Sequence, residues 1–196
     1  EEAACVPLAA QTALQALRDC GRIQPGHKVL INGASGGVGH FAVPIAKALG
    51  AEVHAVCGPG SVGFVESLGA DTVHNYADQP ATAIACTFDI VFDVFGKFTR
   101  GAFARQLGRR GIYVSTVPKP ATIWSEALAR LGFSRASRLV QVRSRGEDLR
   151  QIKEWIESGV VTPHIDRIYP ANRAADAHRH VETRHTKGKV VIDLRG

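Results

Sequence analysis

The sequence predicts an α/β fold: a doubly wound parallel sheet, preceded by a short N-terminal helix and followed by a C-terminal αβ extension. Short runs of β-branched and apolar residues alternate with longer amphipathic stretches, which is the pattern of parallel strands joined by helical crossovers. A glycine-rich turn follows the first of these runs and leads directly into a helical stretch. With 196 residues, the chain has the length of one domain plus an extension.

Each predicted element follows from its local pattern. The predicted strands are short apolar runs, at 28–32, 52–57, 72–75, 89–95, 111–116 and 138–143. The predicted helices have apolar residues at helical spacing, at 9–18, 37–49, 61–68, 99–107, 146–158 and 171–183. Four glycines stand where a helix needs a left-handed cap: Gly50, Gly69, Gly108 and Gly159. We expect a main domain over 1–162 and an extension over 163–196, which adds a strand, a helix and a last strand at 189–194.

Composition argues against several classes of protein. The net charge is +6, but the basic residues are scattered and lack an aromatic platform, which favours a solvated face over nucleic-acid binding. The four cysteines form no metal-ligand pattern, so we expect a reduced, intracellular protein, cytoplasmic or organellar. The apolar stretch 3–17 contains proline and glutamines and fits neither a signal peptide nor a membrane span. There is no methionine, even at position 1, so the numbering either starts inside a longer protein or follows a removed start.

The sharpest motif is the run Lys-Val-Leu-Ile-Asn-Gly-Ala-Ser-Gly-Gly-Val-Gly at 28–39. Gly36 and Gly37 let the backbone approach phosphates, and Gly39 lets the helix pack closely on the sheet. The start of the helix offers free N–H groups and a partial positive charge. Ala34 replaces the first glycine of the usual GxGxxG, which is a mild departure. The motif in this context predicts a Rossmann-type dinucleotide site.

The second strand bears on the choice of cofactor. A carboxylate at its end, about 20 residues after the glycines, would hold the ribose 2′-hydroxyl of NAD. The chain has Gly58 there, and Glu52 lies too early. This absence permits the 2′-phosphate of NADPH, yet no Lys or Arg lies between Lys47 and Lys97 to pair with it. NADPH is the favoured cofactor, with NADH as the alternative.

Two other enzyme classes fit less well. Residues 33–37 match the GxSxG nucleophile motif of hydrolases in form, but the following Val-Gly suits a dinucleotide better, and no partner His and Asp can be placed. A short-chain dehydrogenase needs a lysine four residues after a tyrosine, and none of the three tyrosines has one.

The remaining polar candidates favour structural roles. His178, His180 and His185 lack a joining thiolate or carboxylate, so solvated histidines are favoured over a metal site. Asp93, at a strand end, is interpreted as the cap of the next turn. The pair Glu147 and Asp148 is interpreted as the acidic first turn of a helix.

Several blocks of sequence in a fixed order carry a family resemblance. They are residues 3–17, 33–39, 67–71 with 75–76, 88–93 and 187–192. Across almost its whole length the chain resembles the cofactor-binding portion of the medium-chain dehydrogenase/reductase superfamily, in its zinc-free quinone oxidoreductase branch.

The resemblance implies a set of cofactor-binding residues, while catalytic residues remain unassigned. Thr12 corresponds to a threonine near the nicotinamide. The pyrophosphate contacts are Ser35, Gly37 and Val38, joined by Gly36 from the motif. Gly58 and Tyr76 lie toward the adenosine 2′ end, and Phe95 and Thr116 flank the cleft at strand ends. Zinc enzymes of the superfamily have a cysteine where this chain has Leu8, so no metal is expected, and Cys5 is interpreted as core.

The resemblance also implies a function. We expect an NADPH-dependent oxidoreductase that, in the full-length enzyme, transfers hydride to a small-molecule quinone or α,β-unsaturated carbonyl. The family has an N-terminal barrel-like domain that supplies the other wall of the active site; it is absent from this sequence, so the fragment alone should be inactive. The segment 163–196 and the helix 9–18 should expose apolar surface that this domain covers. A non-catalytic dinucleotide-binding sensor or structural module is the alternative, and homodimerisation follows from the resemblance only.

Overall fold

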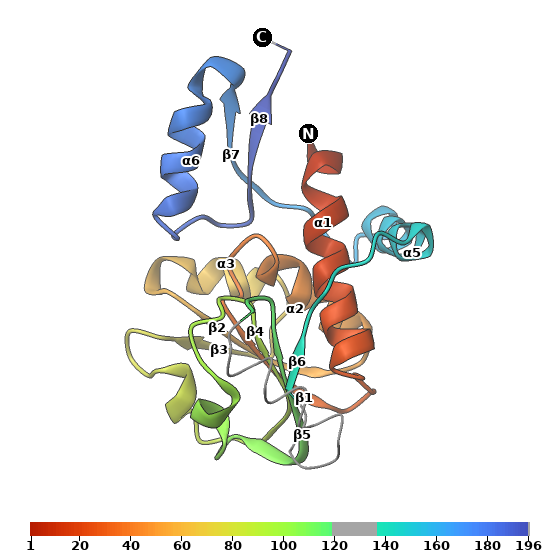
Figure 1. Cartoon of the computed structure of the whole chain (residues 1–196), viewed down its shortest axis with the longest axis vertical. Coiled ribbons are helices and arrows are strands. Elements are labelled where there is room, and N and C mark those ends of the chain that lie inside the picture. The colour runs from red at the N-terminus through yellow and green to blue at the C-terminus, as the bar shows by residue number, and fades with distance from the viewer. Residues whose placement is uncertain (119–136, 196) are drawn as a thin grey trace.

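Six parallel strands form the main sheet of the computed structural model, which describes residues 1–118 and 137–195 (Figure 1). The strands are β1 (Lys28–Asn32), β2 (Glu52–Cys57), β3 (Thr72–Asn75), β4 (Phe88–Asp93), β5 (Leu107–Ser115) and β6 (Ser137–Leu139). Their order in the sheet is β3-β2-β1-β4-β5-β6, so the direction of winding reverses between β1 and β4. This order confirms the predicted doubly wound sheet, and sheets of this kind bind ligands beyond the carboxyl ends of the two strands where the winding reverses.

Apolar side chains bury both faces of this sheet. One core is shared by α1 (Glu2–Gln15), α2 (Gly39–Ala48), α3 (Val62–Ser67) and α5 (Gly146–Glu157). A second core on the other face lies beneath the 3-10 turns Ala81–Ala83 and Arg100–Phe103. Successive strand residues alternate between the two cores because a strand points them to opposite faces. No helix in the described ranges is long and apolar enough to cross a membrane.

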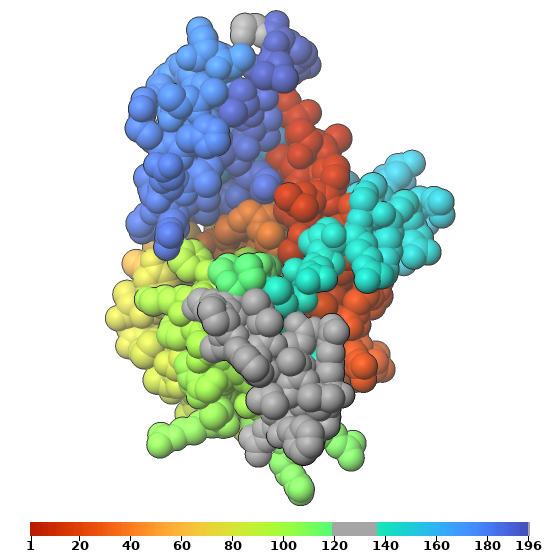
Figure 2. Space-filling model, in the orientation of Figure 1, coloured from red at the N-terminus to blue at the C-terminus, as the bar shows by residue number. Residues whose placement is uncertain are grey.

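The residues after 163 form the predicted extension of strand, helix and strand. Strands β7 (Ile165–Pro170) and β8 (Lys189–Asp193) pair in parallel, and α6 (Ala174–Glu182) connects them. The extension lies over the carboxyl ends of the main strands, where the amide of Gly188 donates to the carbonyl of Ser35 over 2.8 Å. Figure 2 shows its surface, in blue, beside that of α1, in red, and α1 contacts β8.

The helix predicted at 99–107 is wrong. Only the 3-10 turn Arg100–Phe103 forms, and β5 begins at Leu107. The carbonyl of Gln106 accepts a hydrogen bond from the amide of Phe88 over 2.6 Å, so the backbone at Gln106 pairs with β4 and is not helical. Gly108 consequently lies inside β5 and caps no helix. The other three predicted caps are confirmed, with φ of 81° at Gly50, 90° at Gly69 and 75° at Gly159.

Two other element boundaries differ from the predicted ones. Strand β6 ends at Leu139 instead of 143, since the amides of Arg143 and Arg145 donate to the side chains of Gln15 and Gln11. The chain therefore leaves the sheet and follows α1. Helix α1 itself begins at Glu2, seven residues before the predicted start, and continues as a π-helix through Ala16–Cys20.

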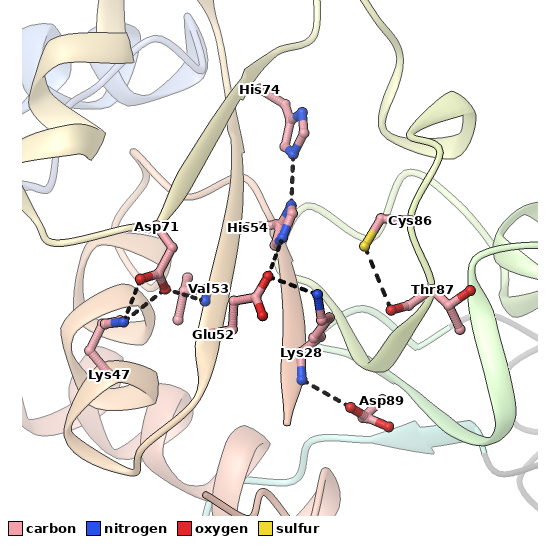
Figure 3. A network of polar contacts seen from close by, with 10 residues as sticks. All are labelled: Lys28, Lys47, Glu52, Val53, His54, Asp71, His74, Cys86, Thr87 and Asp89. Atoms are coloured by element: carbon pink, nitrogen blue, oxygen red, sulfur yellow. Dashed lines mark hydrogen bonds and ion pairs between the residues drawn. The ribbon is translucent and has the colours of Figure 1, made fainter. Parts of the chain in front are cut away.

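Charged and histidine side chains connect the first three strands toward their amino ends (Figure 3). Lys28 Nζ lies 3.0 Å from Glu52 Oε1, and that oxygen lies 3.2 Å from Nε2 of His54. His54 Nδ1 in turn lies 3.0 Å from His74 Nε2. Burial, followed by repulsion from His54, lowers the pKa of His74, which favours a neutral ring in this pair. The network holds β1, β2 and β3 together toward their amino ends, away from the glycine turn.

The buried carboxylate of Asp93 connects β1, β4 and β5 at their carboxyl ends. It accepts hydrogen bonds from Asn32 Nδ2 over 2.8 Å and from the hydroxyl of Tyr113 over 2.9 Å. The amides of Gly96 and Phe98 donate to it over 3.1 and 3.0 Å. Burial, and then the Asp93 charge, raise the pKa of Tyr113, so this hydroxyl remains a donor. The predicted structural role of Asp93 as a turn cap is confirmed and extends to three strands.

Substitution Asp93→Ala should lower the free energy of unfolding by about 3 kcal/mol, because it removes the acceptor of the buried Asn32 side chain and of the Phe98 amide and leaves Tyr113 only the carbonyl of Phe98. Urea unfolding measures this. The matched control is Asp78→Ala, which removes an exposed carboxylate that accepts a hydrogen bond from the Asn75 side chain. It should change the free energy of unfolding by less than about 0.5 kcal/mol. Equal effects of the two variants would contradict the assignment.

Candidate functional site

The turn at 33–38 connects β1 to α2 at the point where the strand order reverses. Gly33 has a φ of 91°, which a side chain would disfavour. The amides of Gly33 and Ala34 both donate to the carbonyl of Val56, over 3.1 and 3.0 Å. The turn is therefore fastened to the end of β2, and Ala34 is compatible with its tight bend.

The other glycines of the turn differ in how much space a side chain would have at each position. A Cβ on Gly39 would overlap the carbonyl oxygen of Gly33, so glycine is needed there for the helix to pack against the turn. A Cβ on Gly36 would meet only the oxygen of Gly33, at 3.6 Å, which is an ordinary contact. Packing within the described chain therefore does not explain Gly36. The close approach of a phosphate group would, as the motif predicts.

Free backbone donors gather at this turn. Among the described residues, the amides of Ser35, Gly37 and Val38 have no backbone or side-chain acceptor. Val38 is the N-cap of α2, so the positive end of the helix dipole lies beside these amides. Unsatisfied N–H groups at a helix start are suited to binding an anion.

Lys189 adds a positive charge to the turn, and the sequence analysis had given it no role. A Cβ on Gly37 would lie 3.2 Å from Cδ and 3.6 Å from Nζ of Lys189, so this side chain lies along the turn. The hydrogen bond from Gly188 to Ser35 holds the start of β8 in place. Within residues 1–118 and 137–195, Lys189 forms no ion pair with a carboxylate. Its charge is thus available to an anion.

Arg184 is a second cation that the sequence analysis missed. Its guanidinium lies 5.5 Å from the ring centroid of Phe95, which follows β4 and is 46% exposed. Phe95 also borders the turn, since its ring would lie 3.6 Å from a Cβ on Gly33. Thr116, after β5, donates its hydroxyl to the carbonyl of Val94 over 2.8 Å and lies close by. The structure therefore brings Phe95, Thr116 and the turn together along the carboxyl edge.

Gly58 and Tyr76 lie together at the ends of β2 and β3. The amide of Tyr76 donates to the carbonyl of Cys57 over 3.0 Å. A Cβ on Gly58 would lie 2.8 Å from the hydroxyl oxygen of Tyr76, so the tyrosine side chain fills the space that a larger residue would take. Tyr76 is half exposed. The two predicted residues thus form one surface at the far end of the crevice from Thr116.

Thr12 belongs to another element, α1. Its side chain is buried, and its hydroxyl donates to the carbonyl of Leu8 over 2.6 Å. Leu8, at the position where zinc enzymes have a cysteine, is 69% exposed and offers no metal ligand. Cys5 is buried, as expected for a core residue. No group of three or more His, Cys, Asp or Glu in the described ranges could hold a metal ion, so the residues present do not fit a zinc site.

His40 lies directly beneath the turn and is fully buried. Its Nδ1 lies 2.9 Å from the carbonyl oxygen of Gly36. Burial, and to a lesser degree the nearby His164 and Lys189, lower the pKa of His40 to about 4. The ring is therefore neutral near pH 7, and the sequence analysis did not single it out.

Comparisons with known proteins place the chain in a family. Residues 68–192 match the family described as zinc-binding dehydrogenase. The chloroplast envelope quinone oxidoreductase homolog of Arabidopsis thaliana is 31% identical over 98% of this chain and 61% of its own length. The mitochondrial NAD(P)H oxidoreductase RTN4IP1 of Mus musculus is 30% identical over 98% of this chain and 55% of its own.

A solved structure agrees with these relatives. The quinone oxidoreductase from Coxiella burnetii superimposes with a TM-score of 0.87 at 30% identity, covering 98% of this chain and 60% of that one. The chain belongs to the zinc-binding dehydrogenase family, within the medium-chain dehydrogenase/reductase superfamily, and it is similar to proteins described as quinone oxidoreductases. It spans roughly three-fifths of the length of these relatives.

The neutral His40 should make stability depend on pH. Its folded pKa of about 4 lies below the ordinary 6.5, so the unfolded chain binds the proton first and stability falls as the pH drops from 6.5 toward 4. The loss assigned to His40 is about 3 kcal/mol at pH 4. Urea unfolding of the wild type and of His40→Phe at pH 7 and pH 4 isolates it. A wild type that loses no more stability than the variant would contradict the buried, neutral ring.

Proposed function

We propose that this chain binds NADPH, with NADH as the alternative, and serves as the cofactor-binding part of an oxidoreductase. In the whole enzyme, hydride would pass to a quinone or to an α,β-unsaturated carbonyl compound. The observation that carries the proposal is the cluster of free amides at Ser35, Gly37 and Val38 beside the unpaired Lys189. This arrangement suits a pyrophosphate, the group that all nicotinamide dinucleotides share.

The proposed cofactor would extend along the carboxyl edge in both directions from the turn. Gly58 and Tyr76 would hold the adenosine end, and Phe95 and Thr116 would border the nicotinamide end, with Thr12 contributing from α1. The bound nicotinamide supplies the hydride, while this chain's residues bind and orient it. The lack of a carboxylate at the end of β2 favours NADPH. Arg184 adds positive charge beside Phe95, and Lys189 adds it beside Gly37 at the turn.

We further propose that residues 1–162 form the dinucleotide-binding domain, and that 163–196 pack against a further domain of a longer protein. Large apolar side chains remain exposed on α1 and on the extension: Leu8, Ile168, Val181 and Leu194. The sheet formed by β7 and β8 has two strands, which is too few for a stable independent unit. The longer quinone oxidoreductase relatives have the additional length that such a domain requires.

The decisive experiment is calorimetric titration of the purified chain with NADPH and with NADH, paired with an assay of quinone-dependent cofactor oxidation. Binding without turnover supports a nucleotide domain that needs further protein for catalysis, and also leaves a sensor module as an explanation. A longer protein that shows turnover with a quinone or enone would then favour the enzyme. Binding of neither cofactor would overturn the proposal for this chain.

Substitution Gly37→Asp should abolish cofactor binding. The new carboxylate would pair with Lys189 and stand against the pyrophosphate, so we expect affinity to fall by roughly 100-fold or more. Calorimetric titration measures the loss. Gly146→Asp is the matched control, since it adds the same charge at the exposed start of α5. An affinity retained in Gly37→Asp would place the cofactor elsewhere.

The two cations should contribute unequally. Because Lys189 lies along the turn, Lys189→Ala should weaken cofactor binding by roughly tenfold, as expected for a lost charge-assisted hydrogen bond. Arg184 is exposed, so Arg184→Ala should cost only about threefold. Lys153→Ala, on the exposed face of α5, is the control for net charge. Titrations at two salt concentrations check the assignment, because the Lys189 contribution should shrink as salt rises; equal loss in all three variants would argue against it.

A further inference from the structure

The carbonyl of Gly36 receives two hydrogen bonds from one residue. The backbone amide of His40 donates to it over 3.0 Å, and the ring atom Nδ1 lies 2.9 Å away. A carbonyl oxygen can only accept, so Nδ1 carries the ring proton. The ring itself is buried and packs against Phe41, with the ring centroids 4.0 Å apart. His40 is therefore a fixed donor beneath the turn.

This bond determines the direction of a neighbouring amide. The carbonyl of Gly36 and the N–H of Gly37 belong to the same peptide group, and in a planar trans peptide they point in opposite directions. With its oxygen held inward by His40, the peptide must direct the N–H of Gly37 outward. That N–H is one of the amides without an acceptor among the described residues. Neither glycine has a Cβ to restrict the rotation of this peptide, so its orientation depends on the two hydrogen bonds that the Gly36 oxygen accepts from His40, one from the backbone amide and one from the ring.

Burial, and then the charges of His164 from the segment before β7 and Lys189 from β8, lower the pKa of His40 and keep its ring neutral. The second ring nitrogen, Nε2, has no hydrogen-bond partner among residues 1–118 and 137–195. The neutral ring therefore leaves Lys189 as the charged group against the turn, and it costs the site no buried cation.

We propose that His40 is a positioning residue for the dinucleotide: its Nδ1–H locks the peptide between Gly36 and Gly37 so that the Gly37 amide faces the cofactor phosphate. The inference rests on the proposed cofactor-binding function and deepens it. His40 does not itself touch the phosphate. It acts through the peptide that it holds, and so it sets affinity without taking part in hydride transfer.

Two substitutions separate this role from ordinary packing. His40→Asn keeps an N–H donor on the γ-carbon, where Nδ1 is attached, but leaves a cavity in place of the ring. His40→Phe keeps the ring volume and loses the donor. If His40 positions the peptide, His40→Phe should bind NADPH about tenfold more weakly, and His40→Asn should stay within about threefold of the wild type. Thermal unfolding should rank them in the opposite order, with His40→Asn the less stable.

A second readout needs no cofactor. In nuclear magnetic resonance spectra of the ligand-free protein, the Gly37 amide should give one sharp signal in the wild type and in His40→Asn. In His40→Phe it should broaden or shift as the peptide rotates. His27→Phe, in an exposed turn, is the control for replacing a histidine.

The outcomes distinguish the two proposals. His40 is supported as a positioning residue if the wild type binds the cofactor and if the affinity of the two variants depends on the N–H donor and not on their stability. Affinity that falls in step with stability in both variants, or an unchanged Gly37 signal in His40→Phe, overturns it. If the wild type binds neither cofactor while the Gly37 signal still changes in His40→Phe, the proposed function fails and the lock on the peptide stands.

Discussion

The buried carboxylate of Asp93 holds the carboxyl ends of the central strands together. The Asp93 side chain is satisfied by four hydrogen-bond donors from β1, β5 and the turn after β4. Moving a carboxylate out of water is costly, and only a full set of donors offsets that cost. The requirement fixes Asn32, the last residue of β1, against the end of β4. The glycine turn begins at the next residue, so its position depends on this network.

The glycine turn also depends on the start of β8, a segment more than 150 residues away in the sequence. Gly188 bonds to Ser35, and Lys189 lies along Gly37. The extension therefore contributes charge to the crevice while leaving apolar side chains such as Leu194 exposed. One element thus faces the glycine turn on one side and, in our proposal, a further domain on the other. A change in how the extension packs would reach the turn directly through Lys189.

Much of the fold could be predicted because its signals are local. Parallel strands buried on both faces need continuous apolar runs, and left-handed helix caps need glycine at positions such as Gly50 and Gly69. The predictions were wrong where residues distant in the sequence form hydrogen bonds with the backbone. The stretch 99–107 has a helical pattern, but β4 binds the carbonyl of Gln106. Strand β6 ends early because the side chains of Gln11 and Gln15 in α1 accept hydrogen bonds from the backbone that follows it.

The sequence by itself determined the class of fold, the glycine turn and the absence of an acidic residue at the end of β2, because each depends on residue types within a short stretch. The family resemblance suggested Ser35, Gly37 and Val38 as pyrophosphate contacts, and their amides have no acceptor among the described residues. Only the tertiary structure decided which charges meet the turn. Lys189 and the buried ring of His40 reach it through packing between α2 and the extension, and contacts between distant segments leave no periodic or compositional pattern in the sequence.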